Sequence, residues 1–191
     1  MRSTGWALAL LLGSAIPAQA GNWSIGSNFG FVLVPGGSFD NRVSVSAAGD
    51  VFYFMPGLRF GLQSASQRHE CFLDGGLSLV SSSEFSETAA QATANYQYNL
   101  GTGTSILYLT GGGGVATRFI GDLGPGGTTV NPVSFVGGGG VGVRHKVGQG
   151  HGTLRAEARL DYVTEGKDWD QVLIPKGTAF GVKLGFDLWL K

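Results

Sequence analysis

Alternating charges occur in one short segment, TLRAEARLDY, where Arg155, Glu157, Arg159 and Asp161 occupy every second position. Two neighbouring carboxylates can act as a general acid and a general base. In an extended strand, however, every second side chain points to the same face, so these carboxylates alternate there with two arginines. A charge inside a narrow interior needs a partner of opposite sign. We therefore expect interior ion pairs at these positions, and not a catalytic pair.

Three histidines and one cysteine are the other candidates for proton transfer, nucleophilic attack or metal binding. His69, His145 and His151 each lie in or beside a short turn-like break, and Cys71 is the single cysteine. A lone cysteine cannot form an internal disulfide, and no Cys/His spacing typical of a metal site is present. The sequence therefore predicts no catalytic residue, no metal site and no cofactor, and Cys71 is expected to be a small apolar filler.

The first 20 residues have the pattern of a secretory signal peptide. Arg2 precedes an apolar stretch at 6–16, Pro17 follows, and a small-x-small triplet predicts cleavage after Ala20. We therefore expect a signal peptide at 1–20 and one domain at 21–191. Cleavage removes one basic residue, so that the 13 basic and 13 acidic residues of the chain become 12 and 13. This balance gives no electrostatic preference for nucleic acid.

The remaining sequence favours strands over helices. The chain contains 34 glycines and 14% charged residues, and apolar and polar residues alternate with almost no helical periodicity. No run of 18 apolar residues follows the signal peptide, which excludes a membrane-spanning helix. The alternation predicts eight strands, at 22–34, 51–63, 71–80, 92–100, 106–119, 133–146, 153–163 and 178–190, with weaker alternation at 43–47 extending the second.

The breaks between these strands alternate in length. The breaks after strands two, four and six are compact, and they read SASQRHE, GTGTS and VGQGHG. Those after strands one, three, five and seven are longer, and the last three read SSSEFSETAAQ, IGDLGPGGTTVN and TEGKDWDQVLIPKG. Short turns at one end and long loops at the other, with an even number of strands, are typical of bacterial outer-membrane barrels.

Charge is divided between the two faces of the predicted strands. One register carries leucine, valine and aromatic residues without Lys, Arg, Asp or Glu. The other register carries seven basic and four acidic residues, namely Arg59, Arg118, Arg144, Lys146, Arg155, Arg159, Lys183, Asp74, Glu157, Asp161 and Asp187. The interior of an eight-stranded barrel is only wide enough for side chains, and Arg or Lys facing lipid at the bilayer midplane costs roughly 2 to 4 kcal/mol. The apolar register therefore faces lipid, and the charges fill the lumen.

The predicted fold class is all-β, a closed antiparallel up-and-down transmembrane barrel of eight strands. In hydrocarbon an open sheet edge would leave backbone amides unpaired, so strand one must pair with strand eight. We expect the aromatic residues near strand ends to form girdles at the membrane interfaces. These residues are Trp23, Phe60, Tyr98, Phe119, Tyr162, Phe180 and Trp189.

On these features the sequence resembles the small eight-stranded outer-membrane barrels of the OmpA and OmpX kind. The last strand, KLGFDLWL, is similar to the C-terminal motif that the barrel assembly machinery reads, with Lys183, Gly185, Leu188 and Leu190 in its positions. The chain ends in Leu190 and Lys191 where that family usually has a terminal phenylalanine. No appended peptidoglycan-binding domain is expected.

The resemblance implies a Gram-negative cell envelope as the location and the outer membrane as the compartment. It implies contact with outer-membrane lipid and lipopolysaccharide, and with the barrel assembly machinery through the last strand. Some barrels of this class are enzymes that modify lipid A at the outer leaflet. Here the three histidines lie beside the short, periplasmic turns, so the chain is not expected to be an enzyme.

Two tracts of four glycines, at 111–114 and 137–140, lie within the fifth and sixth strands. A hairpin between these strands places residues whose numbers sum to about 251 opposite each other, so the tracts form one patch. We expect inward glycines to make room for long lumen side chains such as Arg155 or Arg159, and outward glycines to leave a shallow groove facing lipid. Local curvature alone, or a site for an acyl chain or a second barrel, are the interpretations that remain open. A phosphate-binding loop is not expected, because no Gly-Lys-Ser/Thr follows.

The predicted function is that of a non-enzymatic, integral outer-membrane protein with an envelope-integrity or surface-interaction role. The loop segment EGKDWDQVLIPKG, with Trp169 among charges, and the polar loop SSSEFSETAAQ, with Phe85, are candidates for binding an extracellular ligand. The excess of inward basic residues leaves a narrow, porin-like path for small anions as an alternative. A lipid A-modifying enzyme is the second alternative.

Overall fold

A computed structural model describes residues 22–33, 43–45, 57–81, 85–122, 129–168, 171–174 and 176–190. The predicted signal peptide lies outside these residues. The strands are β1 (Asn22–Leu33), β2 (Val43–Val45), β3 (Gly57–Gln63), β4 (His69–Ser81), β5 (Phe85–Asn99), β6 (Ser105–Asp122), β7 (Thr129–Val130), β8 (Val133–Val147), β9 (Gly152–Val163), β10 (Gly166–Asp168), β11 (Gln171–Ile174) and β12 (Gly177–Leu190). A short 3-10 turn, η1 (Gly148–Gly150), joins β8 to β9. Within the described residues, no helix is long and apolar enough to cross a membrane.

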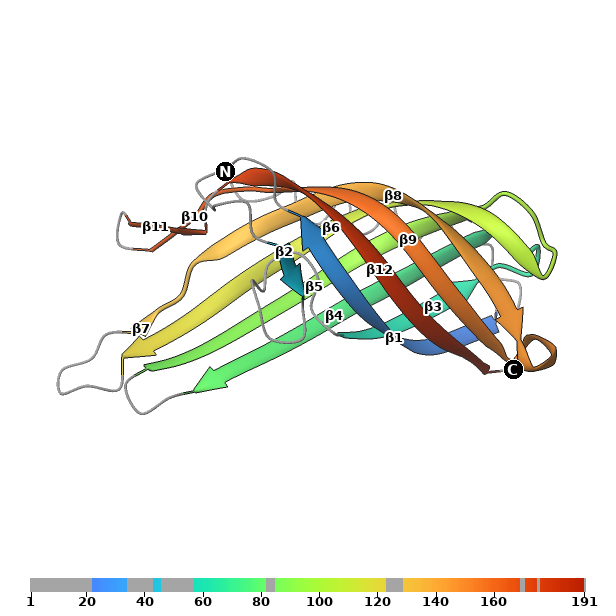
Figure 1. The fold of residues 1–191 in the computed structure, drawn as a ribbon, viewed down its shortest axis with the longest axis horizontal. Coiled ribbons are helices and arrows are strands. Elements are labelled where there is room, and N and C mark those ends of the chain that lie inside the picture. Colours follow the sequence, from blue (N-terminus) through green and yellow to red (C-terminus); the bar gives the residue numbers. More distant parts are fainter. Residues whose placement is uncertain are drawn as a thin grey trace, which may run out of the picture.

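Eight of these strands form one closed wall, as the sequence predicts. Neighbours pair antiparallel in the order β1, β3, β4, β5, β6, β8, β9, β12, and β12 returns to β1 (Figure 1). The closing pair runs from Trp23 opposite Leu190 to Leu33 opposite Phe180. Because every wall strand has two neighbours, the ladder leaves no open edge along this seam. The short strands β2 and β7 pair with β1 and β6, and β10 and β11 form a separate hairpin.

Three of the wall strands, β4, β5 and β6, are at least three residues longer than the sequence predicts. The break SSSEFSETAAQ was predicted as a long loop, but pairing of β4 with β5 continues to Ser81 opposite Ser86. Next to it, β6 reaches Asp122 opposite Phe85. The prediction was wrong because polar residues occur in both registers of this extension, Glu87 in one and Ser86 and Thr88 in the other, so that apolar alternation stops before the backbone ladder does. In Figure 1 the ends of β4, β5 and β6 (green to yellow, lower left) extend beyond those of β1 and β12.

The two glycine tracts lie opposite each other, but their register differs by one from the predicted sum. Gly111 faces Gly139 and Gly113 faces Gly137, so the paired numbers sum to 250. Directly opposed residues in an antiparallel pair point to the same side of the sheet. Leu109 on β6 and Val141 on β8 both point outward, and since both numbers are odd their sum must be even. A sum of 251 would have turned one apolar register into the lumen.

Candidate functional site

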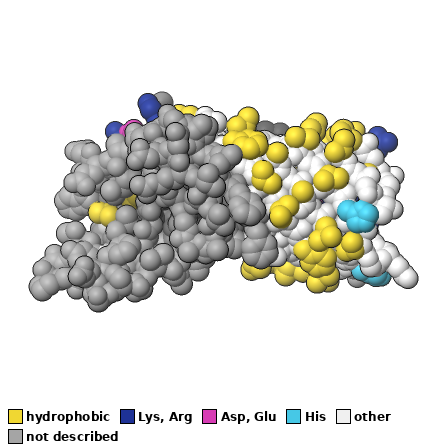
Figure 2. Space-filling view, viewed as in Figure 1, with side chains coloured by type: hydrophobic (Ala, Val, Ile, Leu, Met, Phe, Trp, Pro, Cys, Tyr) yellow, Lys and Arg dark blue, Asp and Glu magenta, His cyan; other side chains and the backbone are white. Residues whose placement is uncertain are grey.

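The outer surface of the wall is apolar. Leu73, Leu107, Phe135 and Leu160 are 56 to 66% exposed on four different strands. Figure 2 shows apolar side chains spread over the described part of one face, with the charged side chains coloured there lying toward the two ends. A monomeric water-soluble protein rarely exposes apolar area on this scale, because each buried Å² is worth about 25 cal/mol. The outer wall therefore suits a hydrocarbon environment.

Six of the seven aromatic residues predicted to form a girdle point outward, and their position at the membrane interfaces stays a prediction. Trp23, Phe60, Phe119, Tyr162 and Phe180 are exposed on the outer wall, and Tyr98 is half-buried there. Trp189 instead points into the barrel, where its indole Nε1 donates to Thr153 Oγ1 at 2.6 Å. The prediction was wrong for Trp189 because this residue shares the register of the inward Asp187.

The interior is polar and closely filled, and its first cluster is built on Glu70. Arg59 donates from Nη2 to Glu70 Oε1 at 2.5 Å, and Arg144 donates from Nη1 to Glu70 Oε2 at 3.3 Å. Gln97 accepts a second bond from Arg59 at 3.1 Å, and the Arg59 guanidinium lies 3.4 Å from the centre of the Phe72 ring. All five side chains are at most 4% exposed. One carboxylate thus serves two guanidinium groups.

Glu70 was missed at the level of sequence, where it was placed in a turn. The structure begins β4 at His69, so Glu70 shares the inward register of Phe72 and Asp74. The sequence did contain the signal. If the predicted strand is extended from Cys71 back to His69, the alternation places Glu70 in the inward register as a fifth acid. Among the described side chains there are therefore five inward acids, one more than the four predicted.

A second cluster joins Arg155 to the first and last strands of the wall. Arg155 donates two hydrogen bonds to Asp187, from Nε to Oδ2 at 2.5 Å and from Nη2 to Oδ1 at 2.9 Å. The same Nη2 donates to Asn28 Oδ1 at 2.8 Å, and Asn28 Nδ2 donates to Asp74 Oδ1 at 3.0 Å. Lys183 Nζ reaches Asp74 Oδ2 at 3.2 Å. The paired fork geometry fixes both side chains and links β9, β12, β1 and β4 across the interior.

The third cluster contains the two carboxylates that the sequence offered as an acid–base pair. Arg159 Nε donates to Asp161 Oδ1 and Oδ2 at 2.8 and 2.7 Å, and Nη1 reaches Glu157 Oε1 at 3.4 Å. Asn95 accepts from Arg159 Nη2 at 3.2 Å. Both carboxylates are therefore engaged by an arginine, and the prediction of ion pairs is confirmed. The side chain of Arg118 lies outside the described part.

Inward glycines make room for these clusters, though not in the way the sequence indicated. A Cβ on Gly138 would collide with Leu160 O and the Asp161 carboxylate, and a Cβ on Gly140 would press against Glu157. The glycine that accommodates Arg155 is Gly185, outside both tracts. The tracts therefore leave space for the carboxylates that bind Arg159, and not for the arginines themselves.

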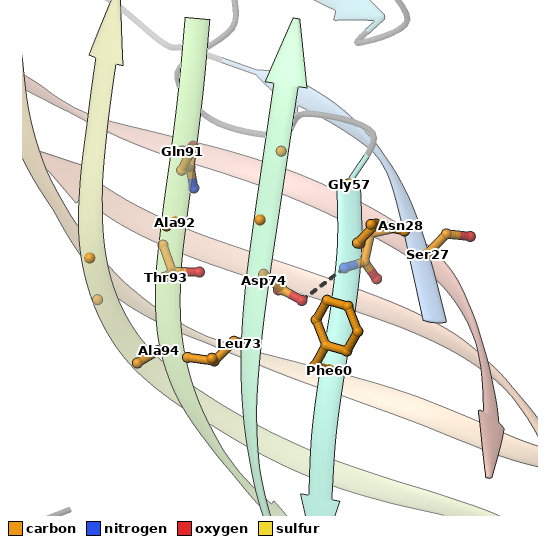
Figure 3. A pocket seen from close by; sticks show the side chains of 15 residues that line it. Ser27, Asn28, Gly57, Phe60, Leu73, Asp74, Gln91, Ala92, Thr93 and Ala94 are labelled. Atoms are coloured by element: carbon orange, nitrogen blue, oxygen red, sulfur yellow. Dashed lines mark hydrogen bonds between the residues drawn. The ribbon is translucent and has the colours of Figure 1, made fainter. Parts of the chain in front are cut away.

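The outward glycines lie beside a hollow in the wall. Two adjoining cavities, of about 880 and 500 Å³, share Phe60, Leu73, Ala94 and Gly113. Figure 3 shows Phe60 and Leu73 on neighbouring strands and, close by, the hydrogen bond from Asn28 to Asp74. The hollow is mainly apolar and lies beside the glycines of β6, which have no side chains to fill it. Whether an acyl chain lies in it stays a prediction.

Two histidines form hydrogen bonds on the outer surface near the short turns. His145 Nδ1 lies 2.7 Å from Ser105 Oγ, its directly opposed neighbour, and His69 Nδ1 lies 2.6 Å from Tyr96 Oη. A serine and a histidine in contact are two parts of a nucleophilic site. Among the described residues, no carboxylate contacts His145 to orient it, and no group of three metal-ligating side chains gathers anywhere. Both contacts fit cross-strand pairing as well.

The segment between β9 and β12 carries the β10–β11 hairpin. Lys167 Nζ lies 2.7 Å from Glu165 Oε1, and this hydrogen bond holds the pKa of the Glu165 carboxyl below its ordinary value. Lys167 and Lys176 are exposed. Trp169, proposed from the sequence as a ligand-binding residue, lies outside the described residues, as do the side chains of 171–174 and of Phe85.

No protein-family model matches the chain, and no curated protein matches it. Solved structures of small barrels are similar to it at low identity. The Neisserial surface protein A (NspA) is 15% identical over 88% of this chain and 96% of its own, with a TM-score of 0.46. The N-terminal barrel of Pseudomonas aeruginosa OprF is 15% identical over 88% and 100%, with a TM-score of 0.45. Ail of Yersinia pestis, in complex with the heparin analogue sucrose octasulfate, is 13% identical over 90% and 100%, with a TM-score of 0.49.

Proposed function

We propose that this protein is an integral barrel of the bacterial outer membrane. The observation that carries the proposal is the division of the two registers, with Leu73, Phe135 and Leu160 outside and Arg59, Glu70 and Arg155 sealed inside. In water this arrangement would expose the apolar set and bury the ionic set, the reverse of what the hydrophobic effect favours. In lipid both sets are stabilised.

Cell fractionation combined with heat-modifiable gel mobility tests this proposal. The full-length chain is expected in the outer-membrane fraction, and its unheated form is expected to migrate differently from the boiled form, since a closed barrel resists detergent. Recovery in the soluble periplasmic fraction, or one mobility before and after boiling, would contradict the proposal. Mass measurement of the isolated protein tests the predicted cleavage after Ala20 in the same sample.

We propose further that the barrel is a rigid scaffold that holds its long loops outside the membrane. A strand of 9 to 11 residues suffices to cross a bilayer, whereas β5, β6 and β8 have 15, 18 and 15 residues. Their short-turn ends stop at Asn99, Ser105 and Val147, so the surplus lies at the opposite end. Stiff strands that stand clear of the membrane hold loops where a ligand outside the cell can reach them.

Deletion of the hairpin segment 166–175 tests the surface role. Whole cells that display the full chain are expected to bind host cells or matrix, and cells with the deletion are expected to lose that binding while the barrel keeps its heat-modifiable mobility. A scrambled segment of the same composition is the matched control for charge. Unchanged binding would exclude this segment and leave envelope integrity, which is tested by the detergent sensitivity of a strain lacking the protein.

The two alternative functions receive less support from the described residues. A pore needs an open path, but Arg59, Arg144, Tyr108 and Gln97 are at most 2% exposed inside the wall. A lipid A-modifying enzyme needs an oriented catalytic set at the outer leaflet, whereas the Ser105–His145 contact lies at the short-turn end.

We also propose that the last strand engages the barrel assembly machinery during insertion.

A further inference from the structure

A polar cavity opens at the short-turn mouth of the barrel, where β3, β8 and β12 end. It has a volume of about 490 Å³ and is lined by inward side chains that include Gln63, Arg144, Lys146 and Trp189, together with Gln149 of the β8–β9 turn. We call it the mouth cavity. No aspartate or glutamate is among its described lining residues, while two of them are cations.

Lys146 differs from the other interior cations in its partners. Its Nζ donates to Gln67 Oε1 at 2.8 Å and to the backbone carbonyl of Thr102 at 3.0 Å, and both acceptors are neutral. Among the described residues no carboxylate lies within ion-pair distance of Lys146, whereas Lys183 has Asp74. The charge of Lys146 is therefore balanced by nothing in the described cavity wall.

Arg144 adds a second, independent observation. It is 2% exposed, and the one carboxylate within ion-pair distance among the described residues, Glu70, is shared with Arg59. Gln63, with its amide oxygen turned toward Arg144, accepts from Nη1 and Nη2 at 2.6 and 2.9 Å. The Arg144 Nε remains buried without a hydrogen-bond partner. A buried guanidinium with an unused donor costs free energy unless an acceptor is supplied.

The charges of the interior are unevenly distributed along the barrel. Arg59, Arg144 and Arg155 have two carboxylates within ion-pair distance, Glu70 and Asp187. Asp74, opposite Arg59, is paired with Lys183, and Lys146 adds a further positive charge next to Arg144. Arg159, in contrast, is flanked by two carboxylates. Cavities lined by one sign of charge and enclosed by low-dielectric walls concentrate ions of the opposite sign.

From these observations we infer that the mouth cavity binds an oxyanion from the aqueous side, a phosphate or carboxylate group held by Lys146 and Arg144. Gln63, Arg144, Lys146 and Trp189 point into the barrel and Gln149 lies in a turn, so the site is reached from the turns and not through the lipid-facing wall. A dissolved anion therefore fits it better than the headgroup of a bilayer lipid. This inference goes beyond the loop-end role proposed above and uses the opposite end of the molecule.

The test follows the Trp189 indole N–H by solution NMR of the folded protein in phosphatidylcholine nanodiscs. Sodium phosphate and sodium acetate are titrated separately at constant ionic strength against sodium chloride, and the Trp189→Phe variant assigns the resonance. At least one of the two anions is expected to give a saturable shift. The absence of saturation with both would overturn the inference.

Variants of Lys146 separate binding from folding. Lys146→Met keeps most of the aliphatic stem but removes the charge, and it is expected to weaken the anion about ten- to hundredfold, the worth of one charged hydrogen bond. Lys146→Arg is expected to retain binding, and Lys167→Met, at an exposed loop lysine, is the matched control. Equal affinity in wild type and Lys146→Met would overturn the inference. Should Lys146→Met not fold, Lys146→Gln replaces it in the same comparison.

A change of lipid distinguishes the source of the oxyanion. In nanodiscs that contain phosphatidylglycerol, the affinity for dissolved phosphate or acetate is expected to be unchanged once ionic strength is matched. An affinity that falls as phosphatidylglycerol is added, with the Trp189 resonance already shifted before titration, would show a lipid headgroup in the site and would contradict the aqueous source.

Discussion

Arg144 and Arg155 lie directly opposite each other on β8 and β9, and both side chains point into the lumen. Two like charges opposed in a ladder destabilise a sheet unless each has its own counter-charge. Here Arg144 turns to Glu70 on β4, whereas Arg155 binds Asp187 on β12. The two arginines therefore link β8 to β4 and β9 to β12. The stability of this opposed pair depends on Glu70 and Asp187, which are far apart in sequence.

Glu70→Gln is expected to destabilise the barrel strongly. It leaves Arg59 and Arg144 without their shared carboxylate, and breaking a buried ion pair on one side costs about 3 to 5 kcal/mol. Reversible urea unfolding in lipid vesicles, followed by tryptophan fluorescence, measures the change. Glu165→Gln at the exposed loop pair with Lys167 is the control and is expected to leave the midpoint unchanged. Equal midpoints for the two variants would show that the Glu70 cluster does not hold the wall together.

How far the sequence leads is visible in this cluster. The direction of each register follows from alternation, because a strand has only two faces and each was assigned to a different solvent. Closure follows from the need to pair every backbone amide in hydrocarbon, and the up-and-down strand order follows from the alternating loop lengths. Glu70 and Trp189 were misjudged at strand ends, where one or two residues decide between turn and ladder. The partner of each arginine could not be predicted, since the choice between Glu70, Asp74 and Asp187 depends on barrel shear and rotamers. The hydrogen-bonded extension of β4 and β5 was missed because it has no apolar face.

Leu109→Arg tests the solvent outside the wall. Leu109 is 48% exposed and is the fifth residue of β6 counted from the short-turn end, about midway along the roughly 10 residues that cross a bilayer. An arginine facing the bilayer midplane is expected to cost about 2 to 4 kcal/mol. Ala65→Arg, in the turn between β3 and β4 where Ala65 is exposed, is the control and is expected to be neutral. The readout is the unfolding free energy in vesicles and the yield of heat-modifiable protein in cells. If Leu109→Arg were tolerated as well as Ala65→Arg, the outer surface would be in contact with water and not with lipid.

A neighbouring pair of glycines separates the packing role of the tracts from curvature. Gly138→Ala is expected to lower stability by about 1 to 3 kcal/mol, because its Cβ overlaps Leu160 O and the Asp161 carboxylate. Gly137→Ala is expected to be neutral or stabilising, since the nearest atom to its Cβ is Gly112 O at 3.6 Å and glycine weakens a strand. Folding yield in detergent and the unfolding midpoint compare the two. Equal losses at both positions would favour a general need for a bendable backbone over room for the Arg159 cluster.

The filled lumen predicts that the intact barrel does not conduct ions. Arg59, Arg144 and Arg155 are buried in the interior and are held by Glu70 and Asp187, so an ion would have to break several buried pairs to pass. Planar bilayers containing the purified protein are expected to show no discrete conductance steps. The double variant Arg59→Ala, Glu70→Ala keeps the net charge but removes both ion pairs of Glu70, with Arg59 and with Arg144, and it is expected to introduce steps or raise the leak if it folds to the heat-modifiable form. Anion-selective steps from the wild-type protein would instead favour the narrow pore, and would require the Arg59–Glu70 cluster to open in the membrane.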